Sequence, residues 1–162
     1  IVSLLDICAF SATHYPEVNR DLLLTGAILH DIGKLAELRW GTSFEYTIEG
    51  QLLGHISIGL AMFEQKVALV PDFPPRLRLL LQHMILTHHG RLEFGSPKLP
   101  MIPEALLLHY LDDLEAKMQT LRTELDRSAV GGREPGTMTD WVRALERPLL
   151  DTRAFLAGEE KP

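Results

Sequence analysis

Residues 21–34 read DLLLTGAILHDIGK and join an apolar helical pattern to a His-Asp pair. The apolar side chains recur at the spacing of one helix face, at Leu22, Leu23, Ile28 and Leu29. Asn19 precedes them as a candidate N-cap, because its side chain can accept a hydrogen bond from a free backbone N–H. We expect the helix to end at His30-Asp31, since Gly33 is a common terminator two residues later. Both polar side chains would then point beyond the end of a packed helix.

The same helical spacing recurs along the chain, and no segment alternates clearly with a period of two. Further helices are expected over residues 1–15, 52–70, 76–89 and 103–127, with Pro75 and Pro103 at helix starts. Residues 40–46 and 91–102 are expected to be loops, and 128–137 the most flexible segment. A short last helix is expected at 141–145. The pattern predicts an all-α fold.

The composition fits one globular domain, with 162 residues of which 46% are hydrophobic and 23% charged. The single cysteine, Cys8, cannot form an internal disulfide or supply a zinc-thiolate cluster. The apolar runs are far shorter than the ~20 residues of a membrane span. Residues 1–10 do not match a signal peptide, because they lack a basic leader and contain Asp6. We therefore expect a cytoplasmic protein with no membrane partner.

The charge constrains the partners. Sixteen Lys and Arg against 22 Asp and Glu leave a formal net charge of −6. Most proteins that bind nucleic acid unaided carry a basic surface. A polyanionic substrate would therefore need local positive charge here, from a bound metal ion or from a small basic cluster.

Six residues form a candidate metal site, and four of them lie at predicted helix ends. They are His30, Asp31, His55, His88, His89 and Asp112. His88-His89 end an apolar helix just before Gly90, and Asp112 lies among leucines, where a carboxylate is costly to bury unless it is paired or bound to a metal. Imidazoles with carboxylates suit manganese, iron, cobalt, nickel or zinc, whereas magnesium prefers oxygen ligands.

Each of these residues also has a structural interpretation. A lone histidine such as His55 is more often structural or on the surface, and Asp112 could pair with a neighbouring cation. Lys34, Arg91 and Lys98 are by default solvated charges. The remaining histidines, His14, His83 and His109, have no special context and are interpreted as structural. The structural interpretation weakens when it must account for all six candidate ligands together.

The motifs resemble those of a known family. Residues 29–34 (LHDIGK) look like the signature of the HD-domain metal-dependent phosphohydrolases. Residues 21–34, 46–58 (YTIEGQLLGHISI), 81–97 (LQHMILTHHGRLEFGSP) and 105–118 (ALLLHYLDDLEAKM) resemble the HD domain of the YhaM-type 3′–5′ exoribonucleases, or cmp-binding-factor proteins. The resemblance covers residues 1–155 and implies a helical bundle of about six to eight helices, followed by a frayed tail over 156–162.

The resemblance also implies a mechanism. The six candidate residues would ligate two divalent ions, with Asp31 bridging them, and the ions would activate a hydroxide to hydrolyse a phosphodiester. Asp31 and Lys34 would be catalytic, and Lys34 would contact a substrate phosphate. Apart from the resemblance, Arg91 and Lys98 flank a turn and could guide the strand by its phosphates. Phe94 could stack a base. The implied substrate is RNA or single-stranded DNA, attacked from its 3′ end.

Two features of the family have no counterpart in this sequence. A further histidine on the family's first helix would fall just ahead of Ile1, and His14 does not replace it, because it lies near the far end of that helix. The family also carries an N-terminal OB-fold that binds nucleic acid. We expect either that the chain is a fragment, with its first helix truncated, or that one metal site has one ligand fewer.

Two alternatives remain open at this point. One is a phosphohydrolase for nucleotides or a cyclic dinucleotide, although the cyclic-dinucleotide subgroup carries a Gly-Tyr-Pro element where residues 90–97 read GRLEFGSP. The other is a non-catalytic module that binds nucleic acid or a protein. Assembly into a homo-oligomer is also left open.

Overall fold

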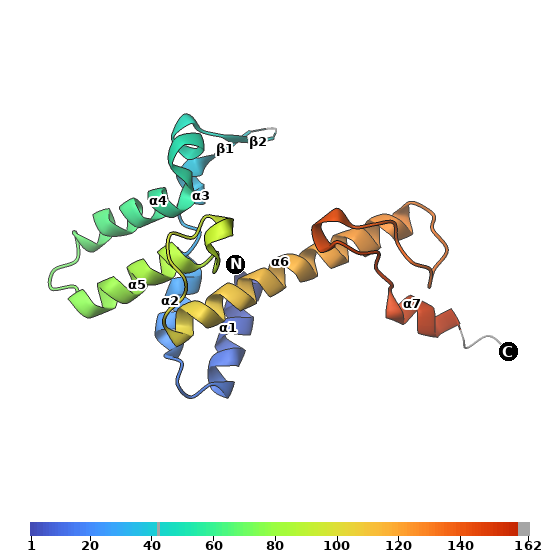
Figure 1. Ribbon diagram of the computed structural model, residues 1–162, viewed down its shortest axis with the longest axis horizontal. Coiled ribbons are helices and arrows are strands. Elements are labelled where there is room, and N and C mark those ends of the chain that lie inside the picture. Colours follow the sequence, from blue (N-terminus) through green and yellow to red (C-terminus); the bar gives the residue numbers. More distant parts are fainter. Residues whose placement is uncertain (42, 159–162) are drawn as a thin grey trace. The chain divides into compact units, whose positions relative to one another are not determined.

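The computed structural model describes residues 1–41 and 43–158 (Figure 1). The chain divides into two compact units, of which the first is Ile1–Asp112 and the second begins at Asp113. Among the described residues no helix is both long enough and apolar enough to span a bilayer.

The first unit holds most of the secondary structure. Its elements are α1 (Val2–His14), α2 (Arg20–Leu29), α3 (Lys34–Glu37), β1 (Leu38–Trp40), β2 (Phe44–Tyr46), α4 (Ile48–Val67), α5 (Pro75–Thr87), the 3-10 helix η1 (Leu92–Phe94) and the start of α6 (Pro103–Val130). The rest of α6, the 3-10 helix η2 (Arg143–Leu145) and α7 (Thr152–Ala157) belong to the second unit. The two strands have three residues each, so the predicted all-α class is confirmed.

The core of the first unit is built from the apolar faces of its longer helices. It comprises Leu4 and Cys8 of α1, Leu22, Leu23 and Ala27 of α2, Phe63 and Val67 of α4, Leu81, Met84 and Ile85 of α5, and Ala105, Leu108 and Leu111 of α6. Because this core fixes α2, α5 and α6 side by side, it also fixes where their polar ends meet.

Two of the predicted helix starts are confirmed. Asn19 caps α2, because its side chain accepts a hydrogen bond from the backbone N–H of Leu22 at 3.0 Å. The backbone N–H of Asn19 donates in turn to the buried carboxylate of Glu104, at the start of α6, at 2.6 Å. Pro75 begins α5 at a position where a helix needs no N–H.

Gly33 has a different role from the predicted one. Its φ of −64° is right-handed, so it does not terminate α2 as a left-handed cap. A Cβ atom at Gly33 would lie 2.0 Å from the backbone oxygen of His55 and 2.6 Å from the backbone nitrogen of Gly59. Glycine is therefore required because α3 and α4 touch backbone to backbone, which places His55 beside the His-Asp pair.

The prediction of a loop or a short irregular crossing over residues 40–46 was wrong at its two ends, which belong to strands. Strands β1 and β2 pair antiparallel in the register Leu38↔Tyr46, Arg39↔Glu45 and Trp40↔Phe44. The Trp40 and Phe44 rings meet edge to face with their centroids 4.9 Å apart, a cross-strand contact that stabilises such a pair. Strands of three residues are too short to show a period of two in the sequence.

Other helix bounds also differ from expectation. Helix α4 begins at Ile48, earlier than predicted, because Thr47 caps it by accepting from the N–H of Gly50 at 2.9 Å. The last predicted helix, at 141–145, is the 3-10 helix η2 instead. No helix was predicted at α7, which Asp151 caps by accepting from the N–H of Arg153 at 3.0 Å. Residues 156–157 of the expected frayed tail belong to this helix. Residues 159–162 of the expected frayed tail lie outside the described residues.

The contact at Gly33 yields a stability prediction. We expect Gly33→Ala to lower the free energy of unfolding by about 3 kcal/mol, because the added methyl must push two backbone segments apart. Gly41→Ala is the matched control, since a Cβ there meets only the Ser43 oxygen at 3.7 Å. Urea denaturation followed by circular dichroism measures both, and equal stability of the two variants would contradict the prediction.

Candidate metal centre

All six predicted ligands lie in the first unit, five of them beside a helix end or bend and one, Asp112, inside a helix. His30 and Asp31 follow the last residue of α2, and His88 and His89 follow the last residue of α5. His55 stands directly after the bend of α4 at Gly54, where φ is 70°. Asp112 comes from α6. The structure therefore brings together residues up to 82 positions apart in sequence.

The four histidine rings share one arrangement, in which Nδ1 hydrogen-bonds to an oxygen. The pairs are His30 with the Ala27 carbonyl at 2.7 Å, His88 with the Ile85 carbonyl at 2.8 Å, His89 with the Phe94 carbonyl at 2.6 Å, and His55 with the Glu37 carboxylate at 3.3 Å. These oxygens only accept, so we assign the ring proton to Nδ1 in each case. Each neutral ring then keeps a lone pair on Nε2, as a metal ligand requires.

Three of the Nε2 atoms converge on one place. Nε2 of His55 lies 3.2 Å from Nε2 of His89, and candidate ligand atoms of His55, His88 and His89 all lie within 4.8 Å of one another. Oδ1 of Asp31 is 3.5 Å from Nε2 of His55 and 3.6 Å from Nε2 of His88. With the ring protons on Nδ1, these three nitrogens and Oδ1 of Asp31 are all hydrogen-bond acceptors, and no proton lies between them.

Two of these atoms are buried without a hydrogen-bond partner, namely Nε2 of His88 and Oδ1 of Asp31. Leaving such atoms unsatisfied costs about 1–3 kcal/mol each, so native proteins seldom tolerate them without a purpose. A divalent cation would satisfy both atoms at once. The imidazoles and carboxylates present therefore fit manganese, iron, cobalt, nickel or zinc.

Asp31 is central to the cluster because its two oxygens face different groups. While Oδ1 faces His55 and His88, Oδ2 lies 3.4 Å from Nε2 of His30 and accepts from Nζ of Lys34 at 2.6 Å. Nε2 of His30 lies in turn 3.6 Å from Oδ1 of Asp112. The carboxylate thus joins two sets of donors, as a bridging ligand would.

Burial and neighbouring charges shift the pKa values of the two buried histidines, His30 and His88, in opposite directions. Burial, reinforced by charge on His30, lowers the pKa of His88 to about 3 and keeps this ring neutral. Burial also disfavours charge on His30, but the carboxylates of Asp112 and Asp31 outweigh it and raise the pKa of His30 to about 9. Burial opposes ionisation of Asp31 and Asp112 too, yet His30 holds the pKa of both carboxyls below the usual range.

Two of the three predicted substrate residues, Arg91 and Lys98, lie on the segment after α5, whereas Lys34 begins α3. The Arg91 guanidinium lies 5.7 Å from the centroid of the exposed Phe94 ring, and the Phe94 carbonyl holds His89. Buried Ser96 fixes this segment through its hydroxyl, which contacts the carbonyls of Leu86 at 3.0 Å and Lys98 at 2.7 Å. Among the described residues, no hydrogen bond or ion pair joins the Arg91 or Lys98 side chains to the six candidate ligands.

The other histidines contact backbone or surface groups. Nε2 of His83 accepts from the Met101 N–H at 2.9 Å, and Nδ1 of His109 donates to the His88 carbonyl at 3.1 Å. His14 packs against Tyr15 near the end of α1. Sequence reasoning missed Glu37, whose carboxylate contacts His55 from 18 positions away, and no spacing in the sequence signals that contact.

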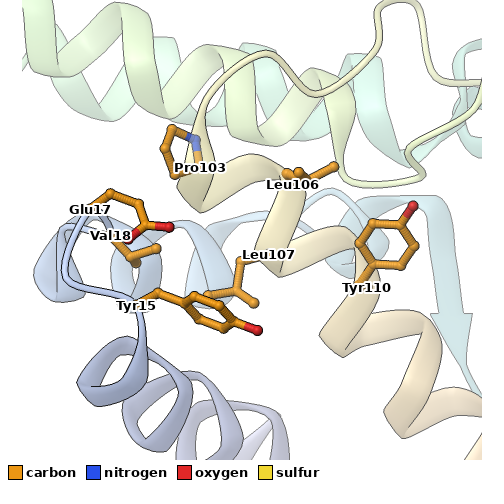
Figure 2. Close-up of a pocket in the computed structure, with 7 residues that line it drawn as sticks. All are labelled: Tyr15, Glu17, Val18, Pro103, Leu106, Leu107 and Tyr110. Atoms are coloured by element: carbon orange, nitrogen blue, oxygen red, sulfur yellow. The ribbon is translucent and has the colours of Figure 1, made fainter.

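An apolar hollow of about 250 Å³ in the first unit is separate from these residues. It lies between the connection after α1 and the start of α6 (Figure 2), and its lining residues are Tyr15, Glu17, Val18, Pro103, Leu106, Leu107 and Tyr110. None of them is a predicted site residue, and the lining offers no cluster of metal donors. The hollow is therefore not the candidate site.

The raised pKa of His30 predicts pH-dependent metal binding. A cation that takes Nε2 of His30 must displace the proton that this ring holds below its pKa of about 9. We expect the apparent affinity for Mn²⁺ to rise about tenfold per pH unit between about pH 6.5 and pH 8.5. Titration calorimetry in two buffers of different ionisation enthalpy measures the released proton, and a pH-independent affinity without proton release would contradict the prediction.

Comparisons with known proteins bear on this site. The family model described as the HD domain matches residues 2–117. The 3′-5′ exoribonuclease YhaM of Bacillus subtilis (strain 168) is 47% identical over 146 residues, which cover 90% of this chain and 45% of that protein. Exoribonucleases of the same name from Bacillus licheniformis and Geobacillus sp. (strain WCH70) are 45% and 44% identical, over 96% and 90% of this chain and 46% and 43% of their own lengths.

The chain thus spans less than half the length of these curated relatives. No solved structure matches it significantly. The comparisons confirm the resemblance that the motifs around His30-Asp31 and His88-His89 indicated. Because the family model covers most of the first unit and continues to residue 117, the chain belongs to the HD domain family.

Proposed function

We propose that this chain is a metal-dependent phosphodiesterase domain that removes nucleotides from the 3′ end of RNA. One observation carries the proposal, namely the convergence of unprotonated imidazole nitrogens on an orphaned, buried oxygen of Asp31. The similarity to proteins named 3′-5′ exoribonuclease supports the choice of reaction and substrate.

The ligand roles follow from the two sides of Asp31. We assign His55, His88 and His89 to the side of Oδ1, and His30 with Asp112 to the side of Oδ2. A pair of divalent ions bound there would supply a hydroxide nucleophile near neutral pH and would neutralise charge on the phosphate. It would also supply the positive charge that a chain of net charge −6 lacks.

The chain's own cations complete the site. Nζ of Lys34 donates one hydrogen bond to Asp31, and its side chain is 47% exposed, so its remaining N–H groups can donate to a phosphate oxygen. The exposed Phe94 ring can stack a base, while Arg91 and Lys98 on the same segment contact phosphates of the strand. Because the Phe94 carbonyl holds His89, this segment is tied to the metal ligands.

Hydrolysis of labelled RNA tests the proposal. With Mn²⁺ present, a 5′-labelled single-stranded RNA should shorten stepwise from its 3′ end and release mononucleotides. Asp31→Ala should abolish both Mn²⁺ binding and shortening. Asp112→Ala should also lose activity, whereas Asp113→Ala should not, since Asp113 forms an exposed ion pair with Lys117.

Three outcomes would contradict the proposal. A fully active Asp31→Ala protein would exclude the metal mechanism. Rapid turnover of free nucleotides with intact RNA would indicate a nucleotide phosphohydrolase, and RNA binding without hydrolysis would indicate a non-catalytic module. Running the assay in parallel on single-stranded DNA decides which polymer is preferred.

The role of Lys34 gives a separate prediction. We expect Lys34→Ala to lower kcat/KM for RNA by about 100-fold, because a charged donor to the phosphate is lost. Mn²⁺ affinity should change little, since Lys34 is not one of the proposed ligands. Lys66→Ala, at the exposed end of α4, is the matched control. Unchanged kinetics in Lys34→Ala would remove this residue from the site.

A further inference from the structure

Glu37 is a buried acid outside the predicted ligand set. It is the last residue of α3 and is only 7% exposed. One oxygen of its carboxylate, Oε1, accepts from the backbone N–H of His55 at 3.0 Å and faces Nδ1 of the same residue at 3.3 Å. Burying a carboxylate is costly unless it is hydrogen-bonded, and here His55 contacts Oε1 through two groups.

The backbone N–H of His55 is free because α4 bends at the residue before it. Gly54 has φ 70° and ψ 156°, which are not helical angles, so the part of α4 from His55 onward begins as a new helix. The first N–H groups of a helix have no partner within it. The Glu37 carboxylate takes one of them, and its negative charge suits a helix N-terminus.

The backbone of Glu37 is itself held in place. Its carbonyl accepts from the Thr47 N–H at 2.9 Å, and the Thr47 hydroxyl contacts the Ala36 carbonyl, also at 2.9 Å. Gly50 lies so close that a Cβ atom there would be 2.3 Å from the Glu37 carbonyl oxygen. The carboxylate therefore approaches His55 from a fixed base.

We propose that Glu37 is a positioning residue of the metal centre. It holds the His55 ring with its proton on Nδ1, so that the Nε2 lone pair faces His89 and Asp31. A helix cap alone would need only the backbone N–H, and the second contact, to the ring, is what orients the ligand. The inference rests on the proposed function, because it takes His55 as a ligand. Carboxylate partners of this kind also make a metal-bound imidazole more basic.

Two variants and a control test the proposal. Glu37→Ala removes both contacts, and Glu37→Gln keeps an oxygen acceptor but loses the charge. Glu45→Gln, at an exposed position of β2, is the matched control. Mn²⁺ affinity should fall about 10- to 100-fold in Glu37→Ala and about tenfold in Glu37→Gln, with no change in the control.

The tautomer of His55 gives a readout that needs neither metal nor RNA. In the metal-free protein, long-range ¹H–¹⁵N correlation of the imidazoles should show His55 protonated on Nδ1, with His55→Gln providing the assignment. Glu37→Ala should shift this ring toward the Nε2–H form. If Glu37→Ala does not fold, Glu37→Gln should still show a partial shift of His55 toward the Nε2–H form, together with weaker Mn²⁺ binding.

The outcomes separate this proposal from the proposed function. A wild-type tautomer together with wild-type Mn²⁺ affinity in folded variants of Glu37 would overturn the positioning role. A wild-type protein that binds no Mn²⁺ would overturn the proposed function instead. The tautomer comparison would still decide whether Glu37 orients His55.

Discussion

The candidate site depends on one constraint, the clustering of four histidine Nε2 atoms. Those of His30, His55 and His88 lie within 3.6 Å of an Asp31 oxygen, and that of His89 faces His55. Two of the rings, His55 and His89, bring these nitrogens within 3.2 Å of each other, which is unfavourable for lone pairs without a proton or cation between them. Packing must therefore hold them there. His30 and His88 are each only 2% exposed and follow helices whose apolar faces form the core, so core burial fixes a polar arrangement that would not form alone.

The ends of α2 and α5 use the same local device. Helix C-termini leave carbonyl groups without partners. His30 returns its Nδ1–H to the Ala27 carbonyl, and His88 returns its own to the Ile85 carbonyl, three residues back in both cases. One hydrogen bond thus satisfies one carbonyl at the end of each helix, fixes the tautomer of the ring and turns Nε2 away from the helix. The helix ends and the candidate ligands His30 and His88 are therefore parts of the same local structure.

This device explains which parts of the site the sequence could reveal. The His30-Asp31 and His88-His89 pairs each follow an apolar helical pattern, so their position at helix ends was predictable. The contact between Glu37 and His55 was not, because it depends on a bend at Gly54 and on the turn through β1 and β2, neither of which has a periodic signature. The sequence singled out Gly33, but its role was predicted wrongly. Glycine is typical both of helix terminators and of close backbone contacts, so the residue type alone does not distinguish the two.

The charge at the candidate site bears on both the proposed metal binding and the proposed RNA binding. His30 and Lys34 lower the pKa of Asp31, and His30 lowers that of Asp112, so both carboxyls are ionised at neutral pH, and Glu37 lies behind His55. Without bound ions, the three carboxylates outnumber the two nearby cations, His30 and Lys34, in a chain whose formal net charge is −6. A phosphodiester would be repelled from such a centre. Under the proposed function, metal binding must therefore precede productive RNA binding. The carboxylates that would bind the metal ions are the same groups that would repel the RNA while no ion is bound.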